Sequence, residues 1–239
     1  METEAALEKI TAWMRDLYGT HLLSLAVFGS LARGNHHGKH SDINLLAVFD
    51  RADAATLALG AAAIRWWREQ GNPAPIMLSQ AEQASSADVF PLEYLDMQLA
   101  HRLLHGPDLF AGAPHFPEQH RLLLEHELRA LILRLRSAFV SLQRDAKGLE
   151  RALTESISTA LTLLRHALVA VGDPMPASGA ATLAAAALRF RFDQGPIEAI
   201  ADARHQGQHL DGSRVRSLFA EYLSALSTVE RALEPSHVS

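Results

Sequence analysis

Two apolar segments that flank a polar, glycine-containing segment constrain the fold more than any other part of this sequence. Residues 22–28 read LLSLAVF, without a charged side chain, and residues 41–49 read SDINLLAVF. Runs of this length and composition predict two buried strands. The segment between them, residues 29–40, reads GSLARGNHHGKH, so it connects the two strands at one edge of a sheet.

The start of this connection has the chemistry of a phosphate-binding turn. Glycine at position 29 lets the backbone approach a ligand closely. The amides of Ser30 and Leu31, at the start of a short helical segment, would point at an anion such as a triphosphate, and the Ser30 hydroxyl adds a donor. Arg33 and Lys39 are the nearby cations that would offset phosphate charge.

The second apolar segment begins with two oxygen-bearing side chains. Because side chains alternate along a strand, Asp42 and Asn44 share one face while Ile43 and Leu45 share the other. Carboxylate and amide oxygens are ligands that Mg²⁺ accepts in proteins. The alternation therefore predicts that Asp42 and Asn44 converge on a metal ion.

The order of strand, Gly-Ser turn, short helix containing Ala-Arg-Gly at 32–34 and Ser-Asp-hydrophobic strand resembles the DNA polymerase β-type nucleotidyltransferase superfamily, with its minimal and aminoglycoside nucleotidyltransferases. The resemblance implies an α+β domain, a small mixed sheet with helices. It also implies that Gly29 and Ser30 bind nucleotide phosphates and that Asp42 binds a divalent metal. Asn44 stands where the superfamily has its second acid, and it offers Mg²⁺ a neutral oxygen in place of a charge.

The superfamily also has a third carboxylate, on a later strand, which assists the metal site and activates the attacking hydroxyl. Residues 74–79, APIMLS, predict a third strand beside the second, but they contain no acid. The nearest acids are Glu82 and Asp88, and neither is in register with that strand. Glu82 is better interpreted as a solvated acid at a helix start, although it could reach the site from the turn.

Helices complete the first half of the chain. Leu7, Ile10 and Met14 predict an amphipathic helix over residues 2–18 that covers the sheet. An alanine-rich segment that ends at residue 68 predicts a second helix, and residues 88–105 predict a third one that carries Asp96. Asp96 either caps or braces the metal side of the cleft or makes a surface or interdomain hydrogen bond, which is the more common role of such a residue.

Beyond a linker rich in proline and glycine, the chain repeats apolar residues at helical spacing to its end. We expect a nucleotidyltransferase-like domain at 1–106, a linker at 107–117 and an all-α helical bundle at 118–239. The stripe from Leu149 through Leu161 to Val171 should be buried in that bundle. The architecture resembles the helical half of aminoglycoside nucleotidyltransferases and the HEPN-type bundles that accompany minimal nucleotidyltransferases.

Composition excludes several classes of protein. There are 22 Lys and Arg residues against 27 Asp and Glu residues, so the net charge of −5 provides no extended surface for nucleic acid. The sequence has no cysteine, which excludes disulfides and thiolate metal sites. The acidic N-terminus is unlike a secretory signal and no apolar run reaches membrane-spanning length, so we expect a cytoplasmic protein without a membrane partner.

Two side-chain groups have both a functional and an ordinary interpretation. His36, His37 and His40 lie in the connection, where they could face phosphate or bind adventitious metal ions. The pair Trp66 and Trp67 could stack on a nucleotide base, but at helical positions at least one ring usually packs in the core.

The sequence thus predicts a nucleotidyltransferase-fold protein that binds Mg²⁺ and an NTP, with ATP as the expected nucleotide, at the Gly29-Ser30 and Asp42 cleft. One acid and one amide provide too little charge for two-metal chemistry, so we expect attenuated or lost nucleotidyl transfer. An active enzyme that moves NMP from NTP to a hydroxyl of a small molecule or protein is the first alternative. An antitoxin-like or regulatory interaction module is the second. The acceptor, the preferred base and self-association as a homodimer stay open.

Overall fold

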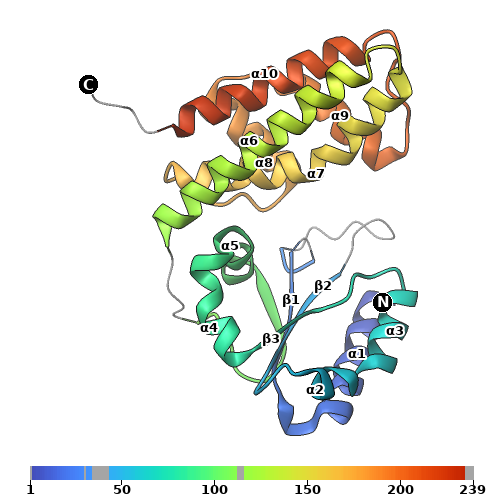
Figure 1. Ribbon diagram of the computed structural model, residues 1–239, viewed down its shortest axis with the longest axis vertical. Coiled ribbons are helices and arrows are strands. Elements are labelled where there is room, and N and C mark those ends of the chain that lie inside the picture. Colours follow the sequence, from blue (N-terminus) through green and yellow to red (C-terminus); the bar gives the residue numbers. More distant parts are fainter. Residues whose placement is uncertain (1, 30, 34–42, 112–115, 235–239) are drawn as a thin grey trace. The chain divides into compact units, whose positions relative to one another are not determined.

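The computed structural model describes residues 2–29, 31–33, 43–111 and 116–234. The chain forms two compact units, Met1–Phe116 and Pro117–Ser239 (Figure 1). The first contains a sheet with helices on both faces, and the described part of the second is helical. The predicted order of an α+β unit followed by an all-α unit is confirmed.

Four strands in the described part of the first unit form one sheet, in the order β3-β2-β1-β4. The strands are β1 (Leu22–Phe28), β2 (Asn44–Phe49), β3 (Ile76–Ser79) and β4 (His101–His105). Strand β1 is antiparallel to both β2 and β4, whereas β2 and β3 are parallel. The sheet is therefore mixed, as predicted.

Two helices cover one face of this sheet, namely α1 (Glu2–Tyr18) and α3 (Ala61–Glu69) (Figure 1). The short helix α2 (Ala54–Ala58) precedes α3, so the alanine-rich segment forms two helices. The buried core on this face combines apolar side chains of α1 and α3 with those of the strands: Leu7, Ile10, Met14, Leu25, Val27, Leu45, Ala47, Phe49 and Trp67. Alternation along β2 sends Leu45, Ala47 and Phe49 to this side.

The opposite face carries helices α4 (Gln80–Val89) and α5 (Pro91–Leu99). Tyr94 and Met97 of α5 pack against Leu46 and Val48 of β2, with Phe110 completing the cluster. Asn44 is two residues before Leu46, so by alternation it belongs to the face that α5 covers.

The predicted single helix over residues 88–105 is wrong. Pro91 begins α5, where its missing amide hydrogen costs nothing, and the helix ends before Ala100, which has an extended φ of −148°. Residues 101–105 then pair with β1, with His101 opposite Phe28. His101 and His105 are thus on a strand, because the open edge of β1 offers hydrogen bonds that the helical pattern alone does not reveal.

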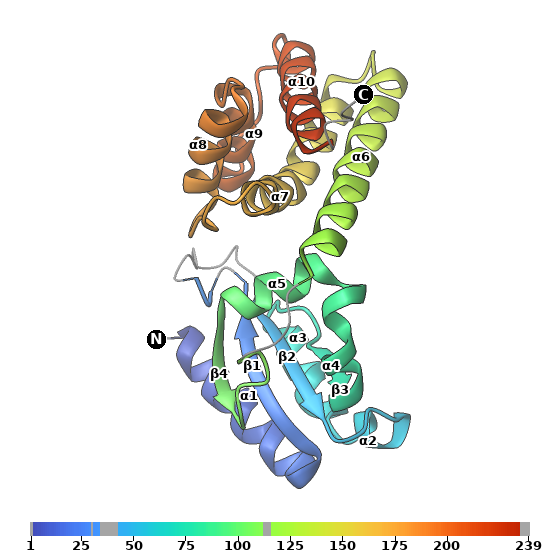
Figure 2. The same cartoon turned by 90° about the vertical axis from the view of Figure 1, so that its left-hand side faces the viewer.

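The described part of the second unit consists of five helices, in agreement with the predicted all-α bundle. They are α6 (Pro117–Ser141), α7 (Ala146–Ala170), α8 (Gly179–Phe190), α9 (Gly195–Gln206) and α10 (Val215–Leu233). Helix α7 packs against each of the other four (Figure 2). Most of its predicted stripe is buried, but Leu161 and Val171 are only half-buried. None of the helices in the described ranges is both long and apolar enough to cross a membrane.

Candidate nucleotide site

The turn after β1 has the geometry that a close backbone approach requires. Gly29 has a φ of +82°, a conformation that L side chains rarely adopt. A Cβ at this position would stand 3.1 Å from the side-chain amide nitrogen of Asn44. The backbone N–H of Arg33 donates to the Gly29 carbonyl at 3.2 Å, which closes a helix-like turn. The positive φ therefore favours glycine, and a Cβ at this position would also press on the Asn44 side chain.

The predicted site residues have different outcomes. Gly29, Arg33 and Asn44 are brought together at one end of the sheet, since Asn44 begins β2 directly opposite Phe28. Ser30, Lys39 and Asp42, and with them His36, His37 and His40, lie outside the described residues. No group of three or more His, Asp or Glu side chains within 2–29, 31–33, 43–111 and 116–234 is arranged to hold a metal ion.

An ion pair links the turn to helix α5. Arg33 Nη1 lies 3.8 Å from Asp96 Oδ1, beyond hydrogen-bond distance but close enough for a strong Coulombic interaction. The side chains are only 13% and 16% exposed, so solvent screens the pair weakly. Sequence reasoning left Asp96 between a brace and a surface residue. The packing of α5 on β2 decides its position, and no local sequence signal reports that packing.

Glu82 is part of a helix cap. Its Oε2 accepts hydrogen bonds from the Ser79 amide at 2.7 Å and from the Ser79 hydroxyl at 2.8 Å. In return, the Glu82 amide donates to Ser79 Oγ at 3.2 Å, which completes a capping box at the start of α4. The bonds from Ser79 hold the pKa of Glu82 below its usual value. The ordinary interpretation of Glu82 as a helix-start acid fits this geometry, and the side chain of Asp88 lies outside the described residues.

The register of β3 shows where a third carboxylate would have to stand. Met77 packs into the core shared with α1 and α3, while Ser79 caps α4. Ile76 is paired with Leu46, so it shares the face of Asn44, and it is 39% exposed. An acid on the Asn44 face of β3 would therefore occupy position 76 or 78, and both positions hold apolar residues, Ile76 and Leu78.

Comparison with known proteins adds one result on the fold. No protein-family model matches the sequence, and no curated protein matches it. A solved structure does match, that of spectinomycin adenyltransferase AAD(9) from Enterococcus faecialis with ATP and spectinomycin. The TM-score is 0.58 over 94% of this chain and 99% of that chain, at 15% sequence identity. The chain has a nucleotidyltransferase fold.

This match confirms the predicted resemblance at the level of fold. At 15% identity the match does not transfer residue roles, so those rest on the geometry of this chain. The region with that geometry is the end of the sheet where β1 leads into the Gly29 turn and where α5 lies (Figure 2).

The tryptophans lie on the other face of the sheet. Trp67 is fully buried in the core with α1. Trp66 lies 6.1 Å from Trp13, ring centroid to ring centroid, and Lys9 Nζ is 4.3 Å from the centroid of Trp66. Because Asn44 faces α5, this aromatic and cationic group is separated from it by the sheet. The alternative in which Trp66 and Trp67 stack on a base has no support from this position, whereas Trp67 packs in the core as the ordinary interpretation expects.

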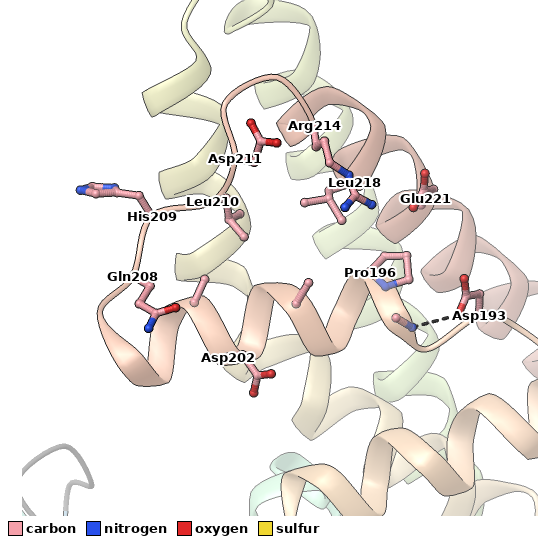
Figure 3. A pocket seen from close by; sticks show the side chains of 13 residues that line it. Asp193, Pro196, Asp202, Gln208, His209, Leu210, Asp211, Arg214, Leu218 and Glu221 are labelled. Atoms are coloured by element: carbon pink, nitrogen blue, oxygen red, sulfur yellow. Dashed lines mark hydrogen bonds between the residues drawn. The ribbon is translucent and has the colours of Figure 1, made fainter.

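The helical unit has an open pocket of about 460 Å³ between α9, the segment after it and α10 (Figure 3). Several of its acids already accept local hydrogen bonds. Asp193 accepts from the Gly195 amide at 2.9 Å, and Asp211 accepts from the amide and hydroxyl of Ser213 at 3.0 and 2.8 Å. These carboxylates organise loops and helix starts, so the pocket is a weaker candidate than the Gly29 turn.

A buried histidine pair lies elsewhere in this unit. His120 Nε2 of α6 is 3.0 Å from His166 Nδ1 of α7, and the residues are 2% and 0% exposed. In this bond one ring donates its N–H and the other ring accepts through its unprotonated nitrogen, so the hydrogen bond links the two helices. This pair joins the two helices that begin the unit.

Proposed function

We propose that this protein binds an NTP, with ATP as the nucleotide, at the Gly29-Ser30 turn, and that its nucleotidyl transfer is attenuated or lost. The supporting observation is the Gly29 turn itself, with its φ of +82°, the Asn44 side-chain amide nitrogen 3.1 Å from the position of a Cβ, and the Arg33 amide closing the turn. Oriented backbone amides at such a turn favour an anionic ligand, and Arg33 adds positive charge.

A Mg²⁺ ion fits this donor set only in part. Asn44, with a side-chain oxygen, and Asp42, which strand alternation in the sequence would place beside it, are the residues that would hold it. When bound, the ion would offset the charge of the phosphates. The Glu82 carboxylate is used in the cap of α4, and the Asn44 face of β3 presents Ile76. This shortage of carboxylates among the described residues supports attenuated transfer, because two-metal catalysis requires several of them.

The second candidate function is an active nucleotidyltransferase with a small-molecule hydroxyl as the acceptor. The observation in its favour is that the matching adenyltransferase, reported with ATP and spectinomycin, is covered over 99% of its length. We assign the nucleotide site to the first unit in either case. The helical unit would contribute to acceptor or partner binding, and the antitoxin-like alternative stays a prediction from sequence.

The test combines nucleotide binding with turnover. Calorimetry should show Mg²⁺-dependent ATP binding that Gly29→Ala weakens at least about tenfold, because the new Cβ enters the space beside Asn44. Gly71→Ala is the matched control, since Gly71 also has a positive φ, +87°, but nothing lies within 4 Å of its Cβ position. Both changes should cost roughly 1 kcal/mol of stability through backbone strain, and only the first should affect ATP.

Absence of ATP binding by the wild type, or equal affinity in the two alanine variants, would contradict the site. Pyrophosphate release should be slow or undetectable with spectinomycin and with other hydroxyl-bearing acceptors. Rapid release that Asp42→Ala abolishes would instead establish the active enzyme.

A further inference from the structure

The ion pair between Arg33 and Asp96 links the Gly29 turn to α5. We propose that Asp96 is a positioning residue of the nucleotide site, whose carboxylate holds the guanidinium of Arg33 beside the Gly29 turn, where it neutralises the triphosphate. This inference rests on the function proposed above. Asp96 would thus raise the affinity for ATP by positioning Arg33.

Arg33 is held at both its backbone and its guanidinium. Its backbone N–H donates to the Gly29 carbonyl at 3.2 Å, so its Cα belongs to the turn. Its Nη1 is 3.8 Å from Asp96, and only 13% of the side chain is exposed. A free arginine side chain samples many rotamers, so a charged partner at its far end reduces the entropy lost when phosphate binds.

Asp96 lies on helix α5, which is anchored firmly to its neighbours. Tyr94 and Met97, on either side of it, are buried against β2. The Tyr94 hydroxyl accepts from Gln83 Nε2 at 3.1 Å, and a ring nitrogen of His101 donates to the Met97 carbonyl at 2.8 Å. Helix α5 is thus tied to α4 and β4, and it gives the Asp96 carboxylate a fixed place at the turn.

Asp96 would affect triphosphate binding in two opposing ways. It orients Arg33, which favours binding, and it carries a negative charge near other negative charges, which disfavours binding. While Arg33 is present, the first effect should dominate, because the ion pair already neutralises the carboxylate. In Arg33→Ala the orienting effect is lost, whereas the repulsion between the Asp96 carboxylate and the triphosphate stays. The sign of the effect of Asp96 should therefore depend on Arg33.

A double-mutant cycle tests this sign. ATP affinity of the full chain is measured by calorimetry for wild type, Arg33→Ala, Asp96→Asn and the double variant. We expect Arg33→Ala to weaken binding about tenfold and Asp96→Asn to weaken it roughly three- to tenfold. In the Arg33→Ala background, Asp96→Asn should strengthen binding by about twofold or more, since it removes a negative charge that Arg33 no longer offsets.

Three controls separate positioning from general support of the fold. Asp96→Glu keeps the charge and should recover most of the affinity. Adenosine, which has no phosphate, should bind equally well to wild type and Asp96→Asn. Asp50→Asn removes the carboxylate paired with His21 at 2.9 Å. That pair is roughly 26 Å away at the other end of β1, at about 3.3 Å per strand residue, so ATP affinity should not change.

The possible results distinguish the proposed role of Asp96 from the proposed ATP site itself. Equal weakening by Asp96→Asn in both backgrounds, or an equal loss of adenosine binding, would show a structural role and overturn the inference while leaving the ATP site intact. No effect of Asp96→Asn in either background would also overturn it. Failure of the wild type to bind ATP would overturn the proposed function as well. If Asp96→Asn does not fold, Asp96→Ala takes its place in the same cycle, with the same signs expected.

Discussion

At the scale of single residues, Glu82 and Asp96 show how neighbours decide what a carboxylate does. Glu82 accepts two hydrogen bonds from Ser79, which lower its pKa and make it a weak base. Asp96 lies 3.8 Å from Arg33, in a place where solvent screens little. The two acids are 14 residues apart in the same stretch of sequence, yet only the second meets the Gly29 turn.

Tyr222 gives a prediction at this scale, on alkaline stability. Burial raises the pKa of Tyr222 to about 12, and its hydroxyl is 3.1 Å from Ser156 Oγ. An unfolded tyrosine ionises near pH 10, so Tyr222 contributes stability that is complete below pH 10 and is lost as the pH rises toward 12. The loss should be on the order of 2–3 kcal/mol between pH 9 and 12.

Urea unfolding followed by circular dichroism, from pH 9 to 12, measures this loss. Tyr222→Phe should be less stable than wild type at pH 9, because the hydroxyl bond to Ser156 is gone, and should lose less stability on going to pH 12. Burial raises the pKa of Tyr18 as well, so Tyr18→Phe measures how much of the alkaline loss of stability comes from the first unit. Parallel curves for wild type and Tyr222→Phe would contradict the assignment.

At the scale of elements, alternation and helical spacing place most side chains, and packing partners decide the rest. Strand β2 sends Leu45 and Ala47 to the α1 side and Asn44 to the α5 side, as its period of two requires. Helix α7 keeps its apolar stripe, but the depth of burial along the stripe depends on which helix covers each turn. Leu164 is fully buried, whereas Leu161 is half-buried near Gly179 at the start of α8.

This difference predicts unequal costs for the same truncation. Leu164→Ala should lower the free energy of unfolding by about 2–5 kcal/mol, because the cavity is enclosed by other helices. Leu161→Ala should cost less than half as much, since part of the side chain is already in solvent. Thermal melts of the two variants side by side give the measurement. Equal losses of stability would show that Leu161 is as enclosed as Leu164.

At the scale of the whole molecule, the chain has two cores. The first unit packs helices on both faces of its sheet, and the second packs four helices around α7. Ion pairs also join helices within the second unit, as between Arg129 of α6 and Glu230 of α10 at 2.6 Å. Each unit thus has the buried surface that a separate domain needs.

The corresponding prediction is that a chain of residues 117–239 folds alone. It should show a helical circular dichroism spectrum and a single cooperative melt, because α7 keeps all four helices that cover it. All three tryptophans, Trp13, Trp66 and Trp67, are in the first unit, so in the full chain their fluorescence follows that unit separately. A fragment that is unfolded, or that melts without cooperativity, would mean that the first unit is needed to complete the second.

The sequence by itself determined the local features of this protein. Hydrophobic runs, periodicity and glycine chemistry predicted β1, β2, β3, the helical second unit and the Gly29 turn, because these features depend on residues close together in the chain. Tertiary structure decided β4, the position of Asp96 and the register that puts Ile76 on the Asn44 face. Residues 101–105 form a strand because β1 has an open edge, and Asp96 reaches Arg33 because α5 packs on β2. Such long-range pairings leave no periodic signal in a single sequence, since the partner is many residues away.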